Sequence, residues 1–413
     1  MSLMRRKGWM RNIFWLPLIL SVTFFGLRYS TAGGQLAGSD RDARALERIN
    51  DRSVGLLPVP FPDDNLPTKA MIRLGRKLFF DRRLSHNGTI SCAMCHVPEQ
   101  GFTVNDTATA VGNEGKSLRR NAPTLINVAF MRSIFHDGRE TSLENQVLFP
   151  LLSPDEMGNP SARHLIGRVR RMADYDGLFE SAFGQGASIE TIGEAIATYQ
   201  RTLISANSRF DRWYFRKEPD ALTKEEERGF RLFAGKANCA QCHIIGEDHA
   251  LFLDHSFHDT GVGWNKTIGN VSADPVVKVQ LAPGVFTSIR REVVDSVGIP
   301  EQKDWGRYEI TRDPSDLLRF KTPTLRNVEL TAPYMHDGSI STLQEVVAFY
   351  NRGGVPHDGL DPSVKPLGLS SGEMDDLVAF LRSLTGDSIP DLVEDARSER
   401  IGNPGETFPA HDE

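Results

Sequence analysis

From about Asp40 onwards, apolar residues recur at the three- and four-residue spacing that is typical of amphipathic helices. Ser188 and Thr223 each precede such a stretch and are followed by acidic residues, which is a usual way for a helix to begin. Long alternating strand patterns are absent from the sequence. The pattern therefore predicts an all-α protein, with helices at Thr68 to Phe80, Ser161 to Phe183, Ile189 to Ser205, Lys224 to Phe233, Thr342 to Tyr350 and Ser371 to Leu384.

Part of this pattern occurs twice. The stretch "MHDGSISTLQEVV" from residue 335 corresponds to "FHDGRETSLENQV" from residue 135, so that His136 and His336 lie 200 positions apart. Upstream, "CAMCH" at residues 92–96 returns as "CAQCH" at residues 239–243. Repetition in one register indicates an internal duplication. We therefore expect two related helical domains, at residues 40–210 and 221–386.

The remaining segments are expected to be irregular. Residues 207–223 have the character of a linker between the halves. The second half carries an insertion from Gly246 to Arg319, which is expected to be loop with a few short elements. Residues 387–413, rich in Pro, Gly and charged residues, are expected to form a flexible C-terminal tail.

The first 32 residues differ in kind from the rest. Basic residues from Arg5 to Arg11 precede an apolar run from Ile13 to Leu27, and Ser30 to Ala32 offer small residues for a signal peptidase. This run is shorter than the roughly 20 residues that span a bilayer. The segment is therefore predicted to be an export signal to the periplasm, and an uncleaved inner-membrane anchor stays open as the alternative.

Charge limits the choice of partners. The 413 residues carry a formal net charge of -6 and show no basic footprint. A protein that binds nucleic acid usually presents such a footprint to the phosphates. We therefore expect no nucleic-acid partner.

All four cysteines lie in the two Cys-x-x-Cys-His motifs: Cys92 and Cys95 before His96, and Cys239 and Cys242 before His243. This order marks covalent attachment of c-type haem, in which two thiols bind the haem vinyl groups and the histidine binds the iron. A four-cysteine zinc site or a pair of redox dithiols would not explain the two trailing histidines. The sequence thus predicts two covalently bound haem c groups.

With these motifs, "RNAPT" and "TPTLRNVELTAPYMHDGS", the chain resembles the bacterial dihaem cytochrome c peroxidase and MauG family over roughly residues 66 to 386. The resemblance implies two cytochrome c-like helical domains, each with one haem. It further implies that hydrogen peroxide reacts at the N-terminal haem, that the C-terminal haem handles electrons and that a calcium ion lies between the domains.

The resemblance also assigns iron ligands. The family places the distal ligand of the C-terminal haem fourteen residues after the second HDG histidine, as methionine in typical peroxidases and as tyrosine in MauG-like proteins. Here that residue is Tyr350, and the equivalent residue of the first half is Pro150, which has no donor for iron. The second haem is therefore expected to be ligated by His243 and Tyr350, and the first to be open opposite His96.

Two polar residues of the first half have apolar counterparts in the second half. Gln146 corresponds to Val346 and Glu156 to Pro356. The resemblance places both in the peroxide pocket, where a carboxylate can move a proton between peroxide oxygens. The other interpretation is an exposed helix residue and a turn cap.

Three departures from the family matter. No histidine lies between His96 and His136, so the loop histidine that closes the peroxidatic haem in typical peroxidases is missing. His136 replaces the usual tryptophan between the haems, and it either bridges them or repeats a structural role of His336. Ala237 replaces the surface tryptophan of MauG, so the substrate of MauG is not carried over, and Trp213, Trp264 and Trp305 are expected to be packing residues.

The resemblance also implies a calcium site, because three residues match calcium-binding positions of the family. Asn121 in "RNAPT" and Thr331 and Pro333 in "TAPY" correspond to protein ligands of the family, which offer the oxygen donors that calcium prefers. The alternative is a turn whose carbonyls meet only water.

The function implied by the resemblance is an exported dihaem oxidoreductase of MauG type, which uses hydrogen peroxide to oxidise a side chain of a periplasmic protein. One alternative is a peroxidase that removes hydrogen peroxide with a small cytochrome or cupredoxin as electron donor. Another is a non-catalytic dihaem electron carrier or redox sensor. A membrane partner is expected only if the N-terminal segment is retained.

Overall fold

The computed structural model describes residues 38–398 except 52, 64, 269–275, 283–284, 291–292 and 294–302. The predicted export signal at residues 1–32 and the end of the predicted tail lie outside the described residues. In the described part of the chain, no helix combines the length and apolar character needed to cross a membrane.

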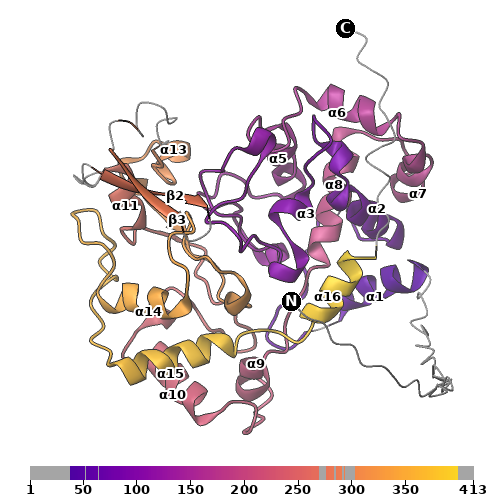
Figure 1. The fold of residues 1–413 in the computed structure, drawn as a ribbon. Helices are drawn as coiled ribbons and strands as arrows, with labels where there is room; N and C mark the ends of the chain where they lie inside the picture. Colours follow the sequence, from indigo (N-terminus) through magenta and orange to yellow (C-terminus); the bar gives the residue numbers. More distant parts are fainter. Residues whose placement is uncertain are drawn as a thin grey trace, which may run out of the picture. The chain divides into compact units, whose positions relative to one another are not determined.

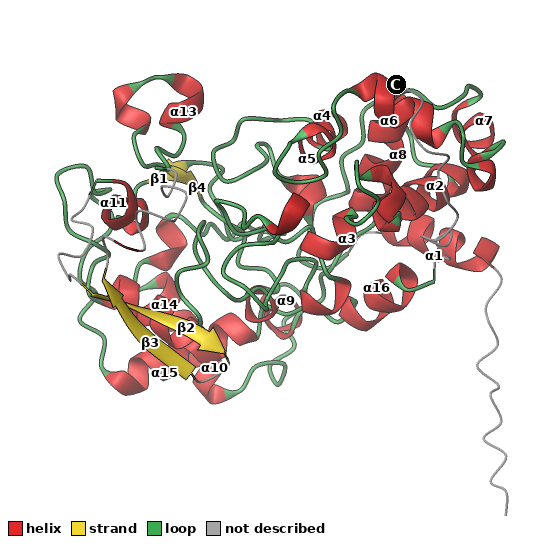
Figure 2. Cartoon of the chain, turned by 45° about the horizontal axis from the view of Figure 1, so that its top comes forward, coloured by secondary structure: helices red, strands yellow, loops and turns green. Residues whose placement is uncertain are grey.

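Helices dominate the first half, as the sequence predicts (Figures 1 and 2). They are α1 (Gly38–Asn50), α2 (Lys69–Phe80), α3 (Cys92–Cys95), α4 (Leu143–Gln146), α5 (Leu148–Leu152), α6 (Ala162–Val169), α7 (Leu178–Phe183) and α8 (Ile189–Arg201). The second half contains α9 (Arg209–Tyr214), α10 (Lys224–Ala234), α11 (Val262–Thr267), α13 (Tyr308–Thr311), α14 (Leu343–Asn351), α15 (Ser371–Arg382) and α16 (Ile389–Ala396).

The predicted helix starts are confirmed. Ser188 caps α8 and Thr223 caps α10, and each side chain accepts a hydrogen bond from the backbone N–H three residues on. The predicted helix from Ser161 to Phe183 is instead broken into α6 and α7, because Tyr175 turns inward to donate to Asp81 at 2.9 Å. Gly177, with a positive φ of 74°, then immediately precedes α7 as its N-cap residue, so the helical conformation is interrupted before α7 begins.

Each half is built on one close helix crossing. In the first half α2 packs against α8, and Gly75 lies so near the Ala195 carbonyl that a Cβ would come within 1.9 Å of it. In the second half α10 packs against α15, and a Cβ on Gly229 would lie 2.0 Å from the Asp376 carbonyl. Glycine is therefore required at both crossings, since a side chain would force the helices apart.

A separate apolar core surrounds each crossing. The core around α2 and α8 includes Leu78, Phe79, Ile192, Ile196 and Tyr199, all fully buried. The core around α10 and α15 includes Phe210, Phe233, Phe252, Val378 and Phe380.

The repeated segments share one backbone geometry. Asn127 and Asn327 have φ of 62° and 59°, and Phe135 and Met335 have φ of 67° and 73°. Thr124 donates to the Gly101 carbonyl and Thr324 to the Leu251 carbonyl, at 2.6 and 2.7 Å. Residues 123–143 and 323–343 are thus similar in backbone conformation as well as in amino-acid sequence.

The linker expected at residues 207–223 is not an irregular connection. It contains α9, whose Phe210 and Asp211 are fully buried. Asp211 forms a two-point ion pair with Arg326 at 2.8 and 2.9 Å, and Arg326 also donates to the carbonyls of Ala250 and Gly55. These buried polar contacts fix α9 to the second half.

The flexible tail expected from residue 387 is wrong for residues 389–396, which form α16 beside α1 and α2 (Figure 1). Leu392 and Ala396 enter the core of the first half, and Arg397 pairs with Glu99 at 2.5 Å. The charged composition of this segment suggested a tail, but α16 is an amphipathic helix whose apolar face is buried.

The insertion contains more strand than expected. Strands β2 (Val276–Ala282) and β3 (Val285–Arg290) pair as an antiparallel hairpin. Strand β1 (Phe257–His258) pairs with β4 (Phe320–Lys321) and joins the loop after the second haem motif to the segment before Pro323.

Candidate functional site

One cavity of about 780 Å³ is lined by residues from both halves of the chain. Every predicted site residue except Cys92 lines it: Cys95, His96, Asn121, His136, Gln146, Pro150, Glu156, Cys239, Cys242, His243, Thr331, Pro333, His336 and Tyr350. Cys92 lines a small neighbouring cavity, together with Cys95, His96 and Gln146. The structure therefore brings together residues that the sequence spreads over more than 250 positions.

The four cysteines are free thiols that lie in two pairs. Cys92 and Cys95 belong to α3, and Cys239 and Cys242 to a short turn after α10. Burial raises the pKa of Cys92 to about 12 and that of Cys95 to about 11, so these thiols stay protonated at neutral pH. No group of three or more cysteines forms among the described residues, which removes the support for a four-cysteine zinc site.

The two motif histidines are oriented in the same way. The Nδ1 atom of His96 donates to the Phe102 carbonyl at 3.0 Å, and that of His243 donates to the Phe252 carbonyl at 2.7 Å. A carbonyl only accepts, so Nδ1 carries the proton and Nε2 keeps its lone pair for a metal. Burial also lowers the pKa of His96 to about 4, which keeps the ring neutral.

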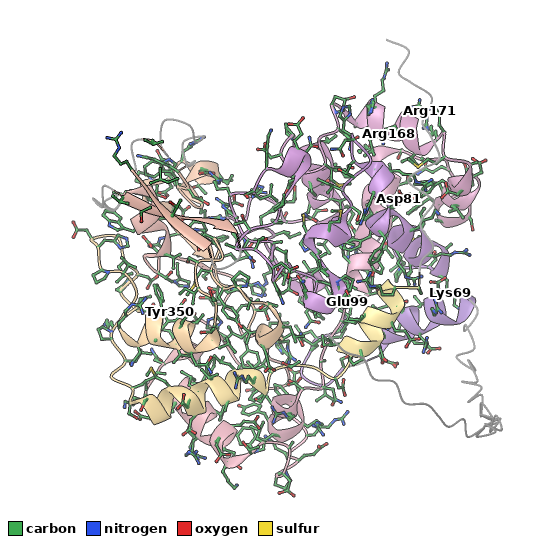
Figure 3. The ribbon with its side chains drawn as sticks, viewed as in Figure 1. Lys69, Asp81, Glu99, Arg168, Arg171 and Tyr350 are labelled. Carbon is green, nitrogen blue, oxygen red and sulfur yellow. The ribbon has the colours of Figure 1, made fainter. Side chains whose placement is uncertain are left out.

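Tyr350 lies in the last turn of α14 (Figure 3). It lines the cavity together with Cys239 and Cys242 of the second thiol pair. Burial, followed by the nearby Cys239 and Cys242, raises the pKa of its hydroxyl. Ionisation of this phenol therefore needs a compensating positive charge, such as a ferric ion.

In the first half the equivalent place is taken by Pro150 of α5. Near it, the Oε1 atom of Gln146 is buried and has no hydrogen-bond partner among the described residues. Burial raises the pKa of Glu156, although Arg139 opposes this effect. An unpaired amide oxygen and a protonatable carboxyl thus line the same cavity as His96, where a polar ligand could satisfy both.

His136 and His336 are joined through one peptide unit. The Nε2 atom of His136 donates to the Asn121 carbonyl at 2.9 Å, and the Asn121 backbone N–H donates to the His336 carbonyl at 2.7 Å. The His336 ring stacks on Phe320 with centroids 3.6 Å apart. The two HDG segments therefore meet in the middle of the cavity.

The residues predicted to bind calcium line the same cavity. The side-chain amide of Asn121 donates to the Ala108 carbonyl at 2.9 Å, so its orientation is fixed and its oxygen remains an acceptor. Thr331 donates its hydroxyl to the Val328 carbonyl at 3.1 Å, and both its hydroxyl oxygen and its backbone carbonyl oxygen keep lone pairs for a cation.

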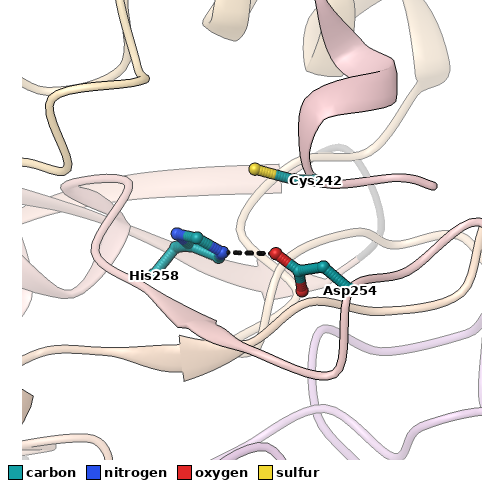
Figure 4. Close-up of side chains that lie close together, drawn as sticks. All are labelled: Cys242, Asp254 and His258. Carbon is teal, nitrogen blue, oxygen red and sulfur yellow. Dashed lines mark hydrogen bonds and ion pairs between the residues drawn. The ribbon is translucent and has the colours of Figure 1, made fainter.

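One polar group beside the second thiol pair belongs to none of the sequence motifs and is centred on His258. His258 is only partly exposed and interacts with Asp254 at 2.8 Å (Figure 4). It also interacts with the Asp361 carboxylate at 2.6 Å. The Cys242 thiol and these carboxylates raise the pKa of His258 to about 10. Cys242, Asp254 and His258 could together hold a metal ion. Haem attachment would consume the thiol, so we assign the group to the wall of the second haem site.

The comparisons with known proteins agree with these features. The family described as di-haem cytochrome c peroxidase matches residues 69–219. The methylamine utilization protein MauG of Methylorubrum extorquens is 34% identical over 382 residues, which cover 91% of this chain and 96% of that protein. The chain belongs to the di-haem cytochrome c peroxidase/MauG family. It is therefore an oxidoreductase, and membership implies two haem c groups.

Other members of the di-haem family are similar over most of the chain. Cytochrome c peroxidase Ccp of Escherichia coli K12 is 34% identical, over 81% of this chain and 62% of that protein. A MauG-like protein associated with microbial copper homeostasis has a TM-score of 0.66 and 32% identity, over 82% of this chain and 96% of that chain. The diheme peroxidase BthA of Burkholderia thailandensis has a TM-score of 0.62 and 25% identity, over 82% and 93%.

The residues present fit the haem groups that the family implies. The cysteines of each motif form no disulfide, and each motif histidine keeps a lone pair on Nε2. The buried amide oxygen of Gln146 has no hydrogen-bond partner among the described residues. The two halves differ at the repeated position, where Tyr350 offers a phenol oxygen to the cavity and Pro150 offers no side-chain donor.

Proposed function

We propose that this chain is a periplasmic MauG-like enzyme that uses hydrogen peroxide to oxidise a side chain of a partner protein. The observation that carries the proposal is the difference between the two halves at one repeated position, Pro150 in one and Tyr350 in the other. The haem groups supply the redox chemistry when bound. The protein residues determine where peroxide binds and where it is excluded.

Peroxide binds beside His96, in the part of the cavity lined by Pro150, Gln146 and Glu156. Pro150 offers no side-chain donor, so it leaves room for a small ligand. Glu156 accepts a proton from one peroxide oxygen and returns it to the other, a role suited to a carboxyl whose pKa burial has raised. The Gln146 side chain orients the bound peroxide by hydrogen bonding.

Peroxide is excluded from the second half. His243 and Tyr350 would hold the second haem, and an anionic phenolate oxygen would favour the more oxidised state of its metal, because the identity of the ligands is a main control of haem potential. This ligand pair suits a site that stores oxidising equivalents.

His136 has a structural role in this proposal. The His136 ring donates a hydrogen bond to the Asn121 carbonyl, and the Asn121 backbone N–H donates one to the His336 carbonyl. These two hydrogen bonds keep the HDG segments of the two halves aligned with each other. We further propose that one calcium ion binds Asn121, Thr331 and Pro333 and stiffens this junction.

A second candidate is removal of hydrogen peroxide with electrons from a small cytochrome or cupredoxin. It is favoured by the likeness to the Escherichia coli cytochrome c peroxidase. The absence of a histidine between His96 and His136 counts against this candidate. Typical peroxidases of the family need reduction to displace that histidine before peroxide can bind, and this chain has no such histidine to displace.

Peroxide consumption by the haem-loaded, fully oxidised protein separates the two candidates. Without any reduced carrier, the MauG-like proposal expects prompt consumption of about one equivalent of peroxide, because the reducing equivalents come from the protein itself. If consumption occurs only after a reduced cytochrome or cupredoxin is supplied, the peroxidase candidate replaces it.

A further inference from the structure

The second half contains a cluster of aromatic rings centred on Phe210 of α9. The ring of Phe210 lies 5.2 Å from Phe252, 5.7 Å from Phe380 and 5.8 Å from Phe230, measured between centroids. On its other side it stacks on Tyr214 at 5.2 Å and meets Trp213 at 6.4 Å. Phe210 itself is fully buried.

This cluster begins at the second motif histidine. His243 donates to the carbonyl of Phe252, and the Phe252 ring is the one in contact with Phe210. The path from His243 therefore consists of one hydrogen bond, then Phe252, then Phe210, and it ends on Tyr214 and Trp213.

A second path runs in parallel. The Phe233 ring lies 6.4 Å from the His243 ring, and Phe380 lies 5.0 Å from Phe233. From Phe380 the contacts continue to Phe230 at 5.6 Å and to Trp213 at 5.1 Å. Both paths converge on Trp213.

The first half lacks this feature. His96 makes the same hydrogen bond to the Phe102 carbonyl, but no aromatic ring pairs with Phe102 in the part of the chain that the structure describes. The nearby rings of Phe79 and Tyr199 pair with each other and are fully buried. The duplication therefore kept the histidine contact in both halves, and only the second half extends it through aromatic rings.

The outer end of the cluster reaches the surface. Trp213 and Tyr214 are partly exposed, and the Lys217 ammonium lies 5.0 Å from the centre of the Tyr214 ring. Ala237, just ahead of the second Cys-x-x-Cys-His motif, is buried and offers no surface contact for electron transfer. An enzyme that oxidises a partner protein needs another contact point, and tryptophan and tyrosine are the side chains that most readily lose one electron.

We propose that Trp213, with Tyr214 beside it, is the surface residue through which this enzyme takes electrons from its protein partner. The inference rests on the proposed function. The partner presents a tyrosine or tryptophan at α9. The phenylalanine rings are too difficult to oxidise to hold the charge themselves, and they serve as close-packed contact between His243 and Trp213.

The electrons balance as follows. Hydrogen peroxide takes up two electrons and two protons and leaves as two molecules of water. Each electron passes inward from Trp213, which becomes an indole radical and is restored by one electron from the partner. A partner tyrosine that gives up an electron also loses its phenolic proton to solvent.

Residue oxidation in the absence of a partner provides the test. The haem-loaded, oxidised protein is treated with hydrogen peroxide alone, and peptides are mapped by mass spectrometry. With no partner to restore Trp213, we expect added oxygen atoms on Trp213. In Trp213→Phe, which keeps an aromatic ring in the core, oxidation of the α9 peptide should fall to the untreated level. The matched control is Trp305→Phe, because Trp305 is also partly exposed but lies outside the cluster. It should leave the map unchanged.

The outcomes separate the inference from the function on which it rests. Consumption of peroxide with oxidation confined to residues away from α9 would overturn the role of Trp213 and leave the proposed function standing. A wild-type protein that consumes no peroxide would overturn both. Normal haem spectra and unfolding of Trp213→Phe exclude misfolding as the cause of a negative map.

Discussion

The Nδ1 atom of His243 lies 2.7 Å from the carbonyl oxygen of Phe252. This hydrogen bond fixes the tautomer of the ring and points Nε2 into the cavity, as such contacts do for metal-binding histidines in general. His96 and Phe102 form the same pair in the first half. The two motif histidines are therefore oriented in the same way, and the halves differ at the repeated position that holds Tyr350 in one and Pro150 in the other.

Replacing Tyr350 with Phe should change the optical spectrum of the second haem, because the chain loses the oxygen donor opposite His243. The matched control is Tyr334→Phe, since Tyr334 also lines the cavity but donates its hydroxyl to the Val328 carbonyl at 3.1 Å. That change should cost about 1 kcal/mol of stability and leave the spectrum intact. A Tyr350→Phe spectrum identical to wild type would disprove the ligand assignment.

Replacing Glu156 with Gln should slow the reaction with peroxide by about 10²- to 10⁴-fold, the usual contribution of a general acid–base residue. Because burial raises the pKa of Glu156, the wild-type rate should fall with decreasing pH at a higher pH than an ordinary glutamate would require. Stopped-flow rates across pH measure both effects. The neighbouring Asp155→Asn, a change in an exposed residue that contacts Lys116 at 3.4 Å, should retain the wild-type rate at neutral pH. Its pH profile should shift slightly towards lower pH, because the Asp155 charge adds to burial in raising the pKa of Glu156.

The buried ion pair between Asp211 and Arg326 should be important for stability. Asp211→Asn leaves the Arg326 guanidinium buried without its counter-charge, so the free energy of unfolding should drop by about 3–5 kcal/mol. Asp376→Asn breaks an ion pair with Arg228 at 2.7 Å, but Arg228 is half exposed, so we expect a much smaller loss. Chemical denaturation compares the two, and equal losses would contradict the account.

The ionisation of Asp304 should make the free energy of unfolding depend on pH in the acidic range. Burial raises its pKa, but two hydrogen bonds from Arg120 at 2.7 Å outweigh this effect and lower the pKa from 3.8 to about 2. The native state therefore holds the ionised form more firmly than the unfolded state does. Its contribution of about 2 kcal/mol is present above pH 3.8 and is lost as pH falls towards 2. Denaturation of Asp304→Asn should show a shallower dependence over this range.

The calcium proposal is tested by the metal content of the purified protein. We expect about one calcium ion per chain, removable by a chelator, and none in Asn121→Ala, because that change removes the fixed amide oxygen. Thr107→Ala provides a control from a nearby exposed loop, where the hydroxyl contacts only the Thr109 carbonyl. Wild-type calcium content in Asn121→Ala would remove Asn121 from the site.

The helices that frame the site could be predicted because each combines an apolar stripe with a capping residue. The site residues could be predicted because they lie in short motifs or at a constant offset of 200 positions between the two halves. In contrast, α16 was missed because Ile389 and Pro390 open a short charged helix, although proline is tolerated in a first turn. The β2–β3 hairpin had a signal that was overlooked, two β-branched runs around Pro283 and Gly284.

The aromatic cluster could not be predicted from the sequence. Trp213 and Phe210 come from an apparent linker, Phe252 from the loop after the second haem motif, and Phe380 from α15. No spacing rule connects these segments, and only the packing of α10 against α15 and α9 brings the rings together. Tertiary contacts of this kind decide whether an aromatic residue is mere packing or part of a path to the surface.

The most direct test of the account is the optical and electron paramagnetic resonance spectrum of the fully oxidised protein, before and after one equivalent of hydrogen peroxide. We predict one high-spin and one low-spin ferric signal, from an open first site and a His243/Tyr350-ligated second site, and both should disappear together on addition of peroxide. Signals that persist until the protein is half-reduced would contradict the account and identify a peroxidase that must be activated by an electron donor.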